Sequence, residues 1–367
     1  MKLIVEPSDG VSPILSAIRQ ARKSVEIAIF RFDHRAIEAE LQAAVARGVK
    51  VIVLIAAVNR GGVESLRKLE LRCLAAGLTV ARTNDDLTRY HDKFIIIDRR
   101  TLYVLSFNFT HLDIERSRGF GIVTKNAQWL QQAVGLFEGD RWRKKFTPRS
   151  NLFVVSPANA RKALGSFLRR AKKELLIYDP KISDKEMLGI LRARAKANVE
   201  IRVIGRVAAN LEAEARKLAP MRLHTRTIIR DRHQAFIGSQ SLRASELDRR
   251  RELGVIVRDT KTVKKLAEIF ESDWNRSGGK GKNGEQEKTA ATEEARRDEK
   301  AEVQDATEVL AEELDPLTAT LKKTVKRVVM GAGEEAFEEK EVKATVKKAV
   351  KKAVKEAIEE VTQETKA

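Results

Sequence analysis

Side chains that could act on a phosphate group lie close together in one run of the chain. His91, Lys93 and Asp98 fill every fixed position of the pattern HxKxxxxD, and Asn108 follows ten residues after Asp98. A neutral imidazole can attack phosphorus at cell pH. In a strand, a lysine two residues later points to the same face and can hold a phosphate oxygen, to which an asparagine can add a hydrogen bond. These residues predict phosphoryl chemistry.

A second copy of the pattern strengthens this prediction. His224, Arg226 and Asp231 form the pattern HxRxxxxD, 133 residues after the first copy. The same offset links residues that follow the two patterns: Ser106 with Ser239, 120–123 with 253–256, Phe137 with Phe270, and Asp140 with Asp273. Upstream the offset becomes 150, which places a longer connection in the first half, between residues 56 and 90. A lone HxKxxxxD occurs often by chance, whereas a duplicated one with matching spacing indicates an internal repeat.

The duplicated pattern resembles the phospholipase D superfamily, whose members break or exchange phosphodiester bonds through a phosphohistidine. The resemblance covers about residues 1–276. It implies that a pseudo-twofold axis relates the two halves and brings His91 and His224 into one cleft. It also implies that no metal or other cofactor is required, because Lys93 and Arg226 would clamp the phosphate.

Differences between the two halves assign roles to the histidines. In this family a carboxylate commonly lies 28 residues after the motif histidine; Glu252 occupies that place in the second half, whereas the first half has Gly119. The resemblance implies that each carboxylate orients the histidine of the opposite half. Glu252 would then hold His91, the expected nucleophile. His224, the expected acid for the leaving oxygen, would lack a carboxylate.

The remaining polar residues of the two patterns follow from the same resemblance. We expect the phosphate to be bound by Lys93, Asn108, Arg226, Ser106, Ser239 and Ser241. Asp98 and Asp231 are expected to brace the motif strands rather than touch the substrate. The three other histidines, His34, His111 and His233, have no metal-ligand spacing, so we expect ordinary core or surface side chains and no metal site.

Strands alternate with helices in both halves, which predicts an α/β fold with a mixed sheet in each half. In the first half we expect an amphipathic segment at 11–23 and helices at 36–47, 63–75 and 127–142. The expected strands are 25–30, 51–55, 94–97, 103–106 and 120–124. In the second half the expected strands are 175–178, 201–204, 227–230, 235–238 and 253–257. The fold class is therefore two tandem phospholipase D-like α/β sandwich halves with pseudo-twofold symmetry.

The composition divides the chain into four parts. We expect phospholipase D-like halves at 1–148 and 149–276, a flexible acidic linker at 277–315 and an amphipathic, Lys/Glu-rich helical tail at 316–367. From Ser277 onward 18 basic residues stand against 21 acidic ones, which leaves 53 basic and 31 acidic residues before it, a net charge of +22. Such an excess attracts polyanions, and both nucleic acid and an anionic membrane qualify.

The rest of the composition indicates the compartment. The single cysteine, Cys73, excludes an internal disulfide and fits a reducing cytoplasm. The first ten residues lack the pattern of a signal peptide, and the longest apolar run, 51–58, is too short to span a bilayer. We therefore expect a cytoplasmic protein without a transmembrane segment, in peripheral contact with the inner face of the membrane.

Three functions are consistent with these patterns. The leading one is a phospholipase D-like phosphodiesterase that hydrolyses or transfers phospholipid head groups, because the two-motif chain resembles the family's bacterial lipid enzymes. The first alternative is a metal-independent nuclease of the same superfamily, which the basic core would suit. The second is a catalytically weak binder of nucleic acid or anionic lipid, since four positions depart from the family pattern: Gly119, Leu105, Arg226 and Ser241.

Overall fold

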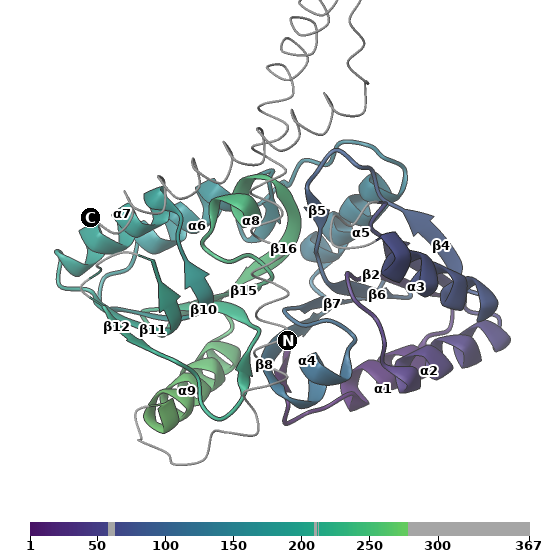
Figure 1. Cartoon of the computed structure of the whole chain (residues 1–367), viewed down its shortest axis with the longest axis horizontal. Helices are drawn as coiled ribbons and strands as arrows, with labels where there is room; N and C mark the ends of the chain where they lie inside the picture. The colour runs from purple at the N-terminus through teal and green to yellow at the C-terminus, as the bar shows by residue number, and fades with distance from the viewer. Residues whose placement is uncertain (58–62, 209–210, 212, 278–367) are drawn as a thin grey trace, which may run out of the picture. The chain divides into compact units, whose positions relative to one another are not determined.

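Two mixed sheets, one from each half of the chain, form the framework of the protein (Figure 1). The computed structural model describes residues 1–57, 63–208, 211 and 213–277. The expected acidic linker and helical tail, from residue 278 to the end, lie outside these residues. Among the described residues, no helix has the length and the apolar character needed to cross a bilayer.

The first half of the described chain contains five helices and eight strands. Its elements in chain order are β1 Lys2–Glu6, α1 Ser12–Gln20, β2 Ser24–Ala28, α2 Arg35–Ala46, β3 Lys50–Ile55, α3 Val63–Ala75, β4 Thr79–Arg82, β5 Arg89–Tyr90, β6 Phe94–Ile97, β7 Thr101–Leu105, α4 His111–Glu115, β8 Ser117–Thr124 and α5 Ala127–Arg141.

The second half repeats this order with fewer elements before its motif strand. Its elements are β9 Phe153–Ser156, α6 Ala160–Arg169, β10 Glu174–Ile182, α7 Lys185–Ala195, β11 Glu200–Val207, β12 Glu214–Arg216, β13 Arg222–Leu223, β14 Arg226–Arg230, β15 Gln234–Gly238, α8 Ala244–Asp248, β16 Arg250–Val257 and α9 Thr260–Ser277. The longer connection expected between residues 56 and 90 contains α3 and β4.

Each sheet takes one short strand from the opposite half. The first sheet has the order β1-β8-β7-β6-β2-β3-β4, and β13 of the second half pairs with β8. The second has the order β12-β11-β10-β14-β15-β16-β5, in which β5 comes from the first half, and β9 also pairs with β16. Because β5 and β13 immediately precede the two motif histidines, this exchange carries each histidine to the start of a strand of the other half, β16 or β8.

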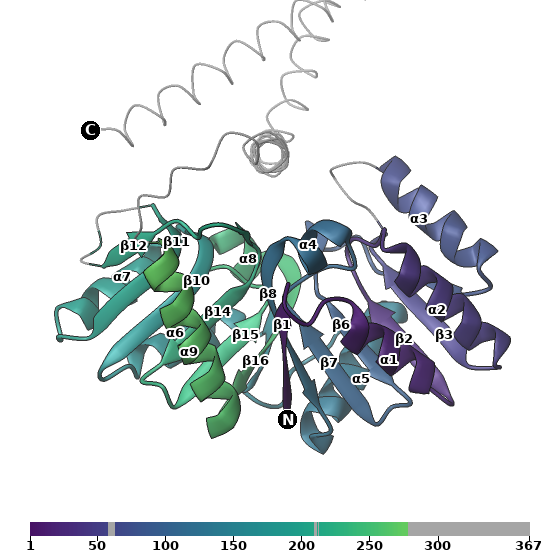
Figure 2. The ribbon, with the colours of Figure 1, turned by 90° about the horizontal axis from the view of Figure 1, so that it is seen from below.

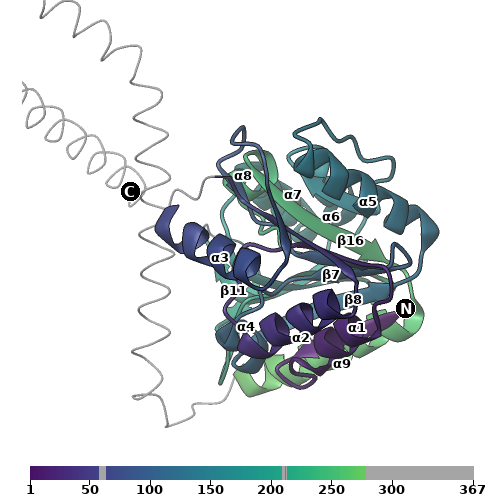
Figure 3. The same cartoon turned by 90° about the vertical axis from the view of Figure 1, so that its right-hand side faces the viewer.

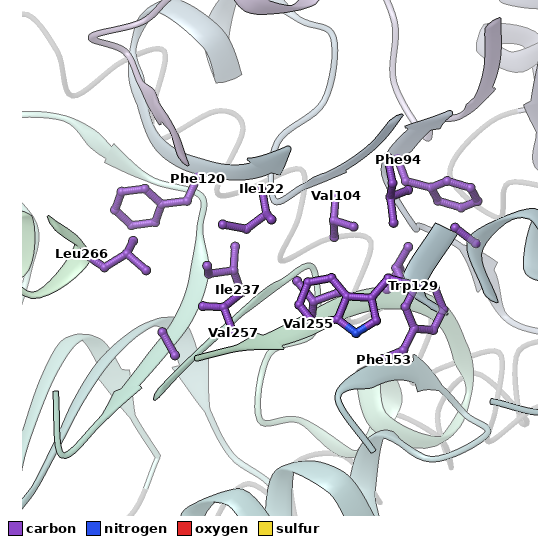
Figure 4. Close-up of a cluster of buried hydrophobic side chains, with 14 of the residues drawn as sticks. Phe94, Val104, Phe120, Ile122, Trp129, Phe153, Ile237, Val255, Val257 and Leu266 are labelled. Carbon is purple, nitrogen blue, oxygen red and sulfur yellow. The ribbon is translucent and has the colours of Figure 1, made fainter. Parts of the chain in front are cut away.

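Three apolar clusters hold these layers together. The outer face of the first sheet packs against α1 to α4, and Figures 2 and 3 show α1 and α2 side by side along it. The outer face of the second sheet packs against α6, α7 and α8. The third cluster lies between the inner faces of the sheets, where Val104 and Ile122 approach Ile237 and Val255 (Figure 4). Burial of apolar surface between the sheets therefore joins the two halves.

The motif strands are buried on both faces and end in matching turns. All four residues of β6, Phe94–Ile97, are buried, as expected for a strand in the interior of a covered sheet. Asp98 and Asp231 follow β6 and β14, and both have φ of 52°, in the left-handed region that aspartate tolerates better than most residues. The two copies of the pattern therefore share one local backbone path.

Candidate active site

His91 is fixed by the second half of the chain. Its main-chain N–H donates to the carbonyl of Arg251 at 2.8 Å, which continues the pairing of β5 with β16. Its ring Nδ1 lies 2.9 Å from a carboxylate oxygen of Glu252, a residue of β16 with no exposed surface. With Nδ1 donating to Glu252, the Nε2 lone pair faces away from the carboxylate.

Lys93 lies on the other side of the His91 ring. Its Nζ is 3.0 Å from His91 Nε2 and donates to the carbonyl oxygen of His91 at 2.7 Å. Burial lowers the pKa of Lys93 to about 7 and raises the pKa of Glu252 to about 8. Burial also lowers the pKa of His91 well below its usual range, and the cations Lys93 and Arg226 act in the same direction. His91 is therefore a neutral base. It lies between Lys93 and Glu252, and burial disfavours the charged form of each.

His224 has a carboxylate of its own, contrary to the expectation from Gly119. Its Nε2 lies 3.1 Å from Oδ2 of Asp113, which is buried in α4 of the first half. Burial lowers the pKa of His224 to about 4, although the charge of Asp113 acts to raise it. The expectation that His224 lacks a carboxylate was wrong because Asp113 reaches the ring from a helix, six residues before the family position at Gly119.

Asp113 and Glu246 are symmetry-related acids that sequence reasoning missed. They are related by the same offset of 133 residues, and each accepts the main-chain N–H five residues before it, from Asn108 at 2.8 Å and from Ser241 at 2.6 Å. Glu246 faces Arg226 and Arg250, at 3.9 and 3.5 Å, rather than a histidine. The offset that revealed the repeat was the signal that could have found this pair.

The second cation, Arg226, is held by neighbours from its own half. Its Nη1 donates to the carbonyl of His224 at 2.7 Å, and its Nε donates to Ser241 Oγ at 3.2 Å. Ser241 therefore orients the arginine. Asn108, its counterpart by offset, donates from Nδ2 to Asp113 at 2.8 Å and also lies 3.4 Å from His224 Nε2. An amide from the first half thus lies beside the histidine of the second.

The two motif serines use their hydroxyls to join neighbouring strands. Ser106 Oγ accepts the main-chain N–H of Phe120 at 2.8 Å, and Ser239 Oγ accepts that of Leu253 at 3.2 Å. Both serines have no exposed surface. These hydrogen bonds position β8 and β16, and contact of either serine with a phosphate stays a prediction.

The two motif aspartates lie apart from this cluster. Asp98 accepts the main-chain N–H groups of Arg22, Lys23 and Ser24, at 3.1, 2.6 and 2.9 Å. Asp231 accepts those of residues 172–174 at 2.7 to 3.1 Å. Each carboxylate thereby fastens the start of a neighbouring strand to the end of its motif strand.

A buried acid lies next to the glycine that replaces the family carboxylate. Glu6 of β1 pairs with Gly119 of β8, just as Ser156 of β9 pairs with Glu252. Glu6 is fully buried, and neither of its carboxylate oxygens has a hydrogen-bond partner among the described residues. Burial raises its pKa to about 8, so Glu6 is largely protonated at neutral pH.

The centre of the site is cationic and only narrowly exposed. The side chains of His91, His224 and Arg226 keep 9, 10 and 12% of their surface exposed, whereas Lys93 has none. The charges of Arg226, Arg89 and Arg250 all lower the pKa of His91, so both halves contribute positive charge around it. A small anionic group presented at the surface could reach the histidines, and it would be stabilised by these cations.

Comparison with known proteins connects this geometry to a family. The family model described as "Cardiolipin synthase, PLD-like domain" matches residues 14–141 and 164–274, which include both motifs. Mitochondrial cardiolipin hydrolase of Mus musculus is 29% identical over 148 residues, which are 39% of this chain and 62% of that relative. The chain therefore spans less than two thirds of the length of the curated relatives it matches.

Solved structures share the arrangement of both halves. Polyphosphate kinase from Porphyromonas gingivalis superposes with a TM-score of 0.62 and 20% identity, over 74% of this chain and 50% of that one. Phosphatidylserine synthase of Haemophilus influenzae Rd KW20 superposes with a TM-score of 0.58 and 9% identity, over 75% of this chain and 86% of that one. At these identities the similarity establishes the two-half α/β fold.

Proposed function

The chain belongs to the phospholipase D superfamily, and on that premise we propose that it is a phosphodiesterase that hydrolyses or transfers phospholipid head groups. The observation that carries the proposal is the buried set of Glu252, His91 and Lys93. Glu252 holds Nδ1 of His91 at 2.9 Å, which leaves Nε2 as the atom that can attack phosphorus. Lys93, 3.0 Å from that Nε2, is placed to hold a phosphate oxygen there.

The proposed reaction has two steps. His91 Nε2 forms a bond to phosphorus while the bond from phosphorus to the leaving oxygen breaks, and that oxygen receives a proton from His224. Water or an alcohol then attacks phosphorus, gives its proton back to His224 and releases His91. Lys93 and Arg226 donate hydrogen bonds to the non-bridging oxygens in both steps. Asn108 is placed to join them, since its amide lies 3.4 Å from His224.

The charges in the site change when the substrate binds. In the free protein, burial lowers the pKa of both His224 and Lys93. A phosphodiester anion beside them favours their protonated forms and raises both pKa values. Substrate binding would therefore favour the protonated forms of His224, the proposed acid, and Lys93, which would hold the phosphate. In the ring orientation of the structure, Asp113 lies at Nε2 of His224, which favours His91 as the nucleophile.

A phospholipid substrate is supported by the relatives and by the surface. The curated relatives are named for cardiolipin, a phospholipid. The +22 net charge before Ser277 would draw the protein to an anionic leaflet. Peripheral membrane contact and a cytoplasmic location follow as parts of the same proposal.

The decisive experiment compares substrates side by side. Purified full-length protein is incubated with anionic vesicles, zwitterionic vesicles, and single- and double-stranded nucleic acid, with EDTA present. We expect release of head groups from anionic vesicles. Cleavage of nucleic acid with intact vesicles would instead identify a nuclease, and binding without turnover on every substrate would identify a non-catalytic protein.

The nucleophile is tested in the same assay. His91→Ala should abolish turnover and should also abolish the acid-labile label that a radioactive phosphodiester leaves on the protein. His233→Ala, which changes an exposed histidine outside both motifs, is the matched control and should be fully active. Label on His224 with an active His91→Ala protein would reverse the assignment of the two histidines.

A further inference from the structure

Two histidines outside both motifs meet a glutamate on the surface of the first half. One potential ligand atom from each of His34, His111 and Glu115 lies within 4.8 Å of the others. His111 Nδ1 is 2.9 Å from Glu115 Oε1, and His34 Nε2 is 3.9 Å from the same oxygen. The two imidazole rings stack, with their centroids 4.2 Å apart. Residues 77 positions apart in the chain therefore form one cluster.

The buried ring of His34 distinguishes this cluster from a chance surface contact. Only 4% of His34 is exposed, yet neither ring nitrogen has a hydrogen-bond partner among the described residues. Buried polar atoms nearly always have a partner, and one without any is open to a bound ion or water. His111 and Glu115 are more than half exposed, so this ligand would reach the cluster directly from solvent.

The backbone around the cluster is firmly held. The main-chain N–H groups of Asp33 and His34 both donate to the carbonyl of Phe109 at 3.0 Å, where α2 begins. Asp33 in turn accepts from the main-chain N–H of His111 at 3.4 Å. The three side chains therefore project from a fixed junction between the start of α2 and α4, rather than from a mobile loop.

We propose that His34, His111 and Glu115 bind a divalent transition-metal ion, with zinc as the best match. Two imidazoles and one carboxylate are a common three-ligand set for zinc, and water can complete the tetrahedron. The ion would supply the partner that His34 Nε2 lacks.

Binding requires one local adjustment. The two rings are nearly parallel, with an angle of 23° between their planes, whereas a ligand points a ring nitrogen at the ion. His111 is 55% exposed and can rotate its side chain, while the buried His34 stays in place. Glu115, four residues after His111 on the same helix, already faces it.

The position of the site suggests what the ion does. The short helix α4 carries His111 and Glu115, and between them it carries Asp113, which contacts His224 in the proposed active site. An ion bound to α4 and to the start of α2 would fasten this helix to the rest of the first half. It would act as a structural metal, and the proposed phosphoryl chemistry would not pass through it.

Calorimetry on full-length protein without a histidine tag tests the proposal. The protein is stripped with EDTA, dialysed and titrated with zinc chloride. We expect one zinc ion per chain, and affinity that falls by more than about tenfold in both His111→Ala and Glu115→Gln. Both changed residues are exposed, so the fold should persist even if His34→Ala fails to fold. His233→Ala, on the opposite half, is the matched control and should bind like the parent protein.

A second probe separates this site from zinc bound elsewhere. Cobalt(II) should give a visible absorption spectrum typical of nitrogen and oxygen ligands, and His111→Ala and Glu115→Gln should both lose it. No saturable binding, or equal binding by the parent protein and both ligand variants, would overturn the proposal. Since the measured quantity is metal binding, failure of the proposed phosphodiesterase activity would leave this result unaffected.

Discussion

At the scale of single residues, Asp113 lies 3.1 Å from Nε2 of His224, the proposed acid. If the carboxylate stabilises the histidine cation, Asp113→Asn should slow cleavage of diesters with an alcohol leaving group by about 10²-fold or more, because such a group needs a proton. Diesters that release nitrophenolate should be much less affected. The measurement is kcat for the two kinds of diester in the same preparation.

Glu246, the counterpart of Asp113 in the second half, provides the control. Glu246→Gln removes the acid that faces Arg226 and Arg250, so it should weaken phosphate binding equally for both leaving groups. An equal loss of rate on both diesters in Asp113→Asn would assign Asp113 to folding or binding, and His224 would lose its support as the acid.

The pKa of Lys93 predicts a pH dependence. Burial lowers it to about 7, so the free protein loses the positive charge of the clamp as the pH rises above about 7. The value of kcat/KM should therefore fall on the alkaline side, well below the usual range of a lysine, because this ratio reports groups of the free enzyme. A pH profile from 5 to 10, roughly, would show the decline.

One substitution isolates the lysine from its neighbours. Glu252, whose pKa burial raises to about 8, gains its charge in the same pH range. Arginine stays protonated throughout, so Lys93→Arg should shift the alkaline decline upward even if the overall rate is lower. An unchanged decline in that variant would assign it to another group.

At the scale of elements, the turns after the two motif strands hold strands together. Asp98 accepts three main-chain N–H groups, and these outweigh burial, so its pKa is lowered. Asp98→Ala should lower the free energy of unfolding by about 1.5–3 kcal/mol, because charged hydrogen bonds are lost. Asp231→Ala should cost a similar amount, since its contacts match. Urea denaturation measures both, and the exposed Asp85→Ala should be neutral.

The main strands and helices could be predicted because periodicity and burial act over many residues. β6 was expected at 94–97 and lies there, and α3 was expected at 63–75 and lies there. The strands β5 and β13 have two residues each, which is too short for any pattern to indicate. Their pairing depends on contacts between the halves, so the exchange of strands could not be read from the chain.

The site was predictable only where its residues share one short pattern. The contact of Glu252 with His91 joins residues 161 positions apart, and only the family resemblance suggested it. Asp113 reaches His224 from a five-residue helix, and His34 meets His111 although they are 77 positions apart in the chain. Such pairs depend on how helices and strands pack together, and the residue spacing within one segment does not predict this packing.

At the scale of the whole molecule, two buried ion pairs tie each half to the other. Arg118 donates to Asp273 at 2.8 and 2.9 Å, and its counterpart Arg251 donates to Asp140 at 2.9 Å. Each pair joins the two halves, and all four side chains are at most 9% exposed. Tyr178 adds a hydrogen bond to Asp273 at 2.8 Å.

The pair of Arg118 and Asp273 predicts how substitutions change the free energy of unfolding. Asp273→Ala should lower the free energy of unfolding by about 3–5 kcal/mol, because it leaves the Arg118 charge buried without its partner. Replacing both Arg118 and Asp273 by leucine should cost less than the single change, since no charge is left unpaired. Urea denaturation of the parent protein and the two variants gives the comparison. A single change that costs under about 1 kcal/mol would show that water reaches the pair.

The exchange of β5 and β13 also bears on how such a chain can evolve. Each histidine completes its surroundings with residues of the opposite half, so two identical copies of an ancestral half could have formed the same pair of sites by associating. In that arrangement every mutation would appear twice. After gene duplication and fusion, a mutation alters one side only, and Lys93 and Arg226, or Asp113 and Glu246, are free to diverge. A shared site that began as symmetric could in this way acquire a division of labour.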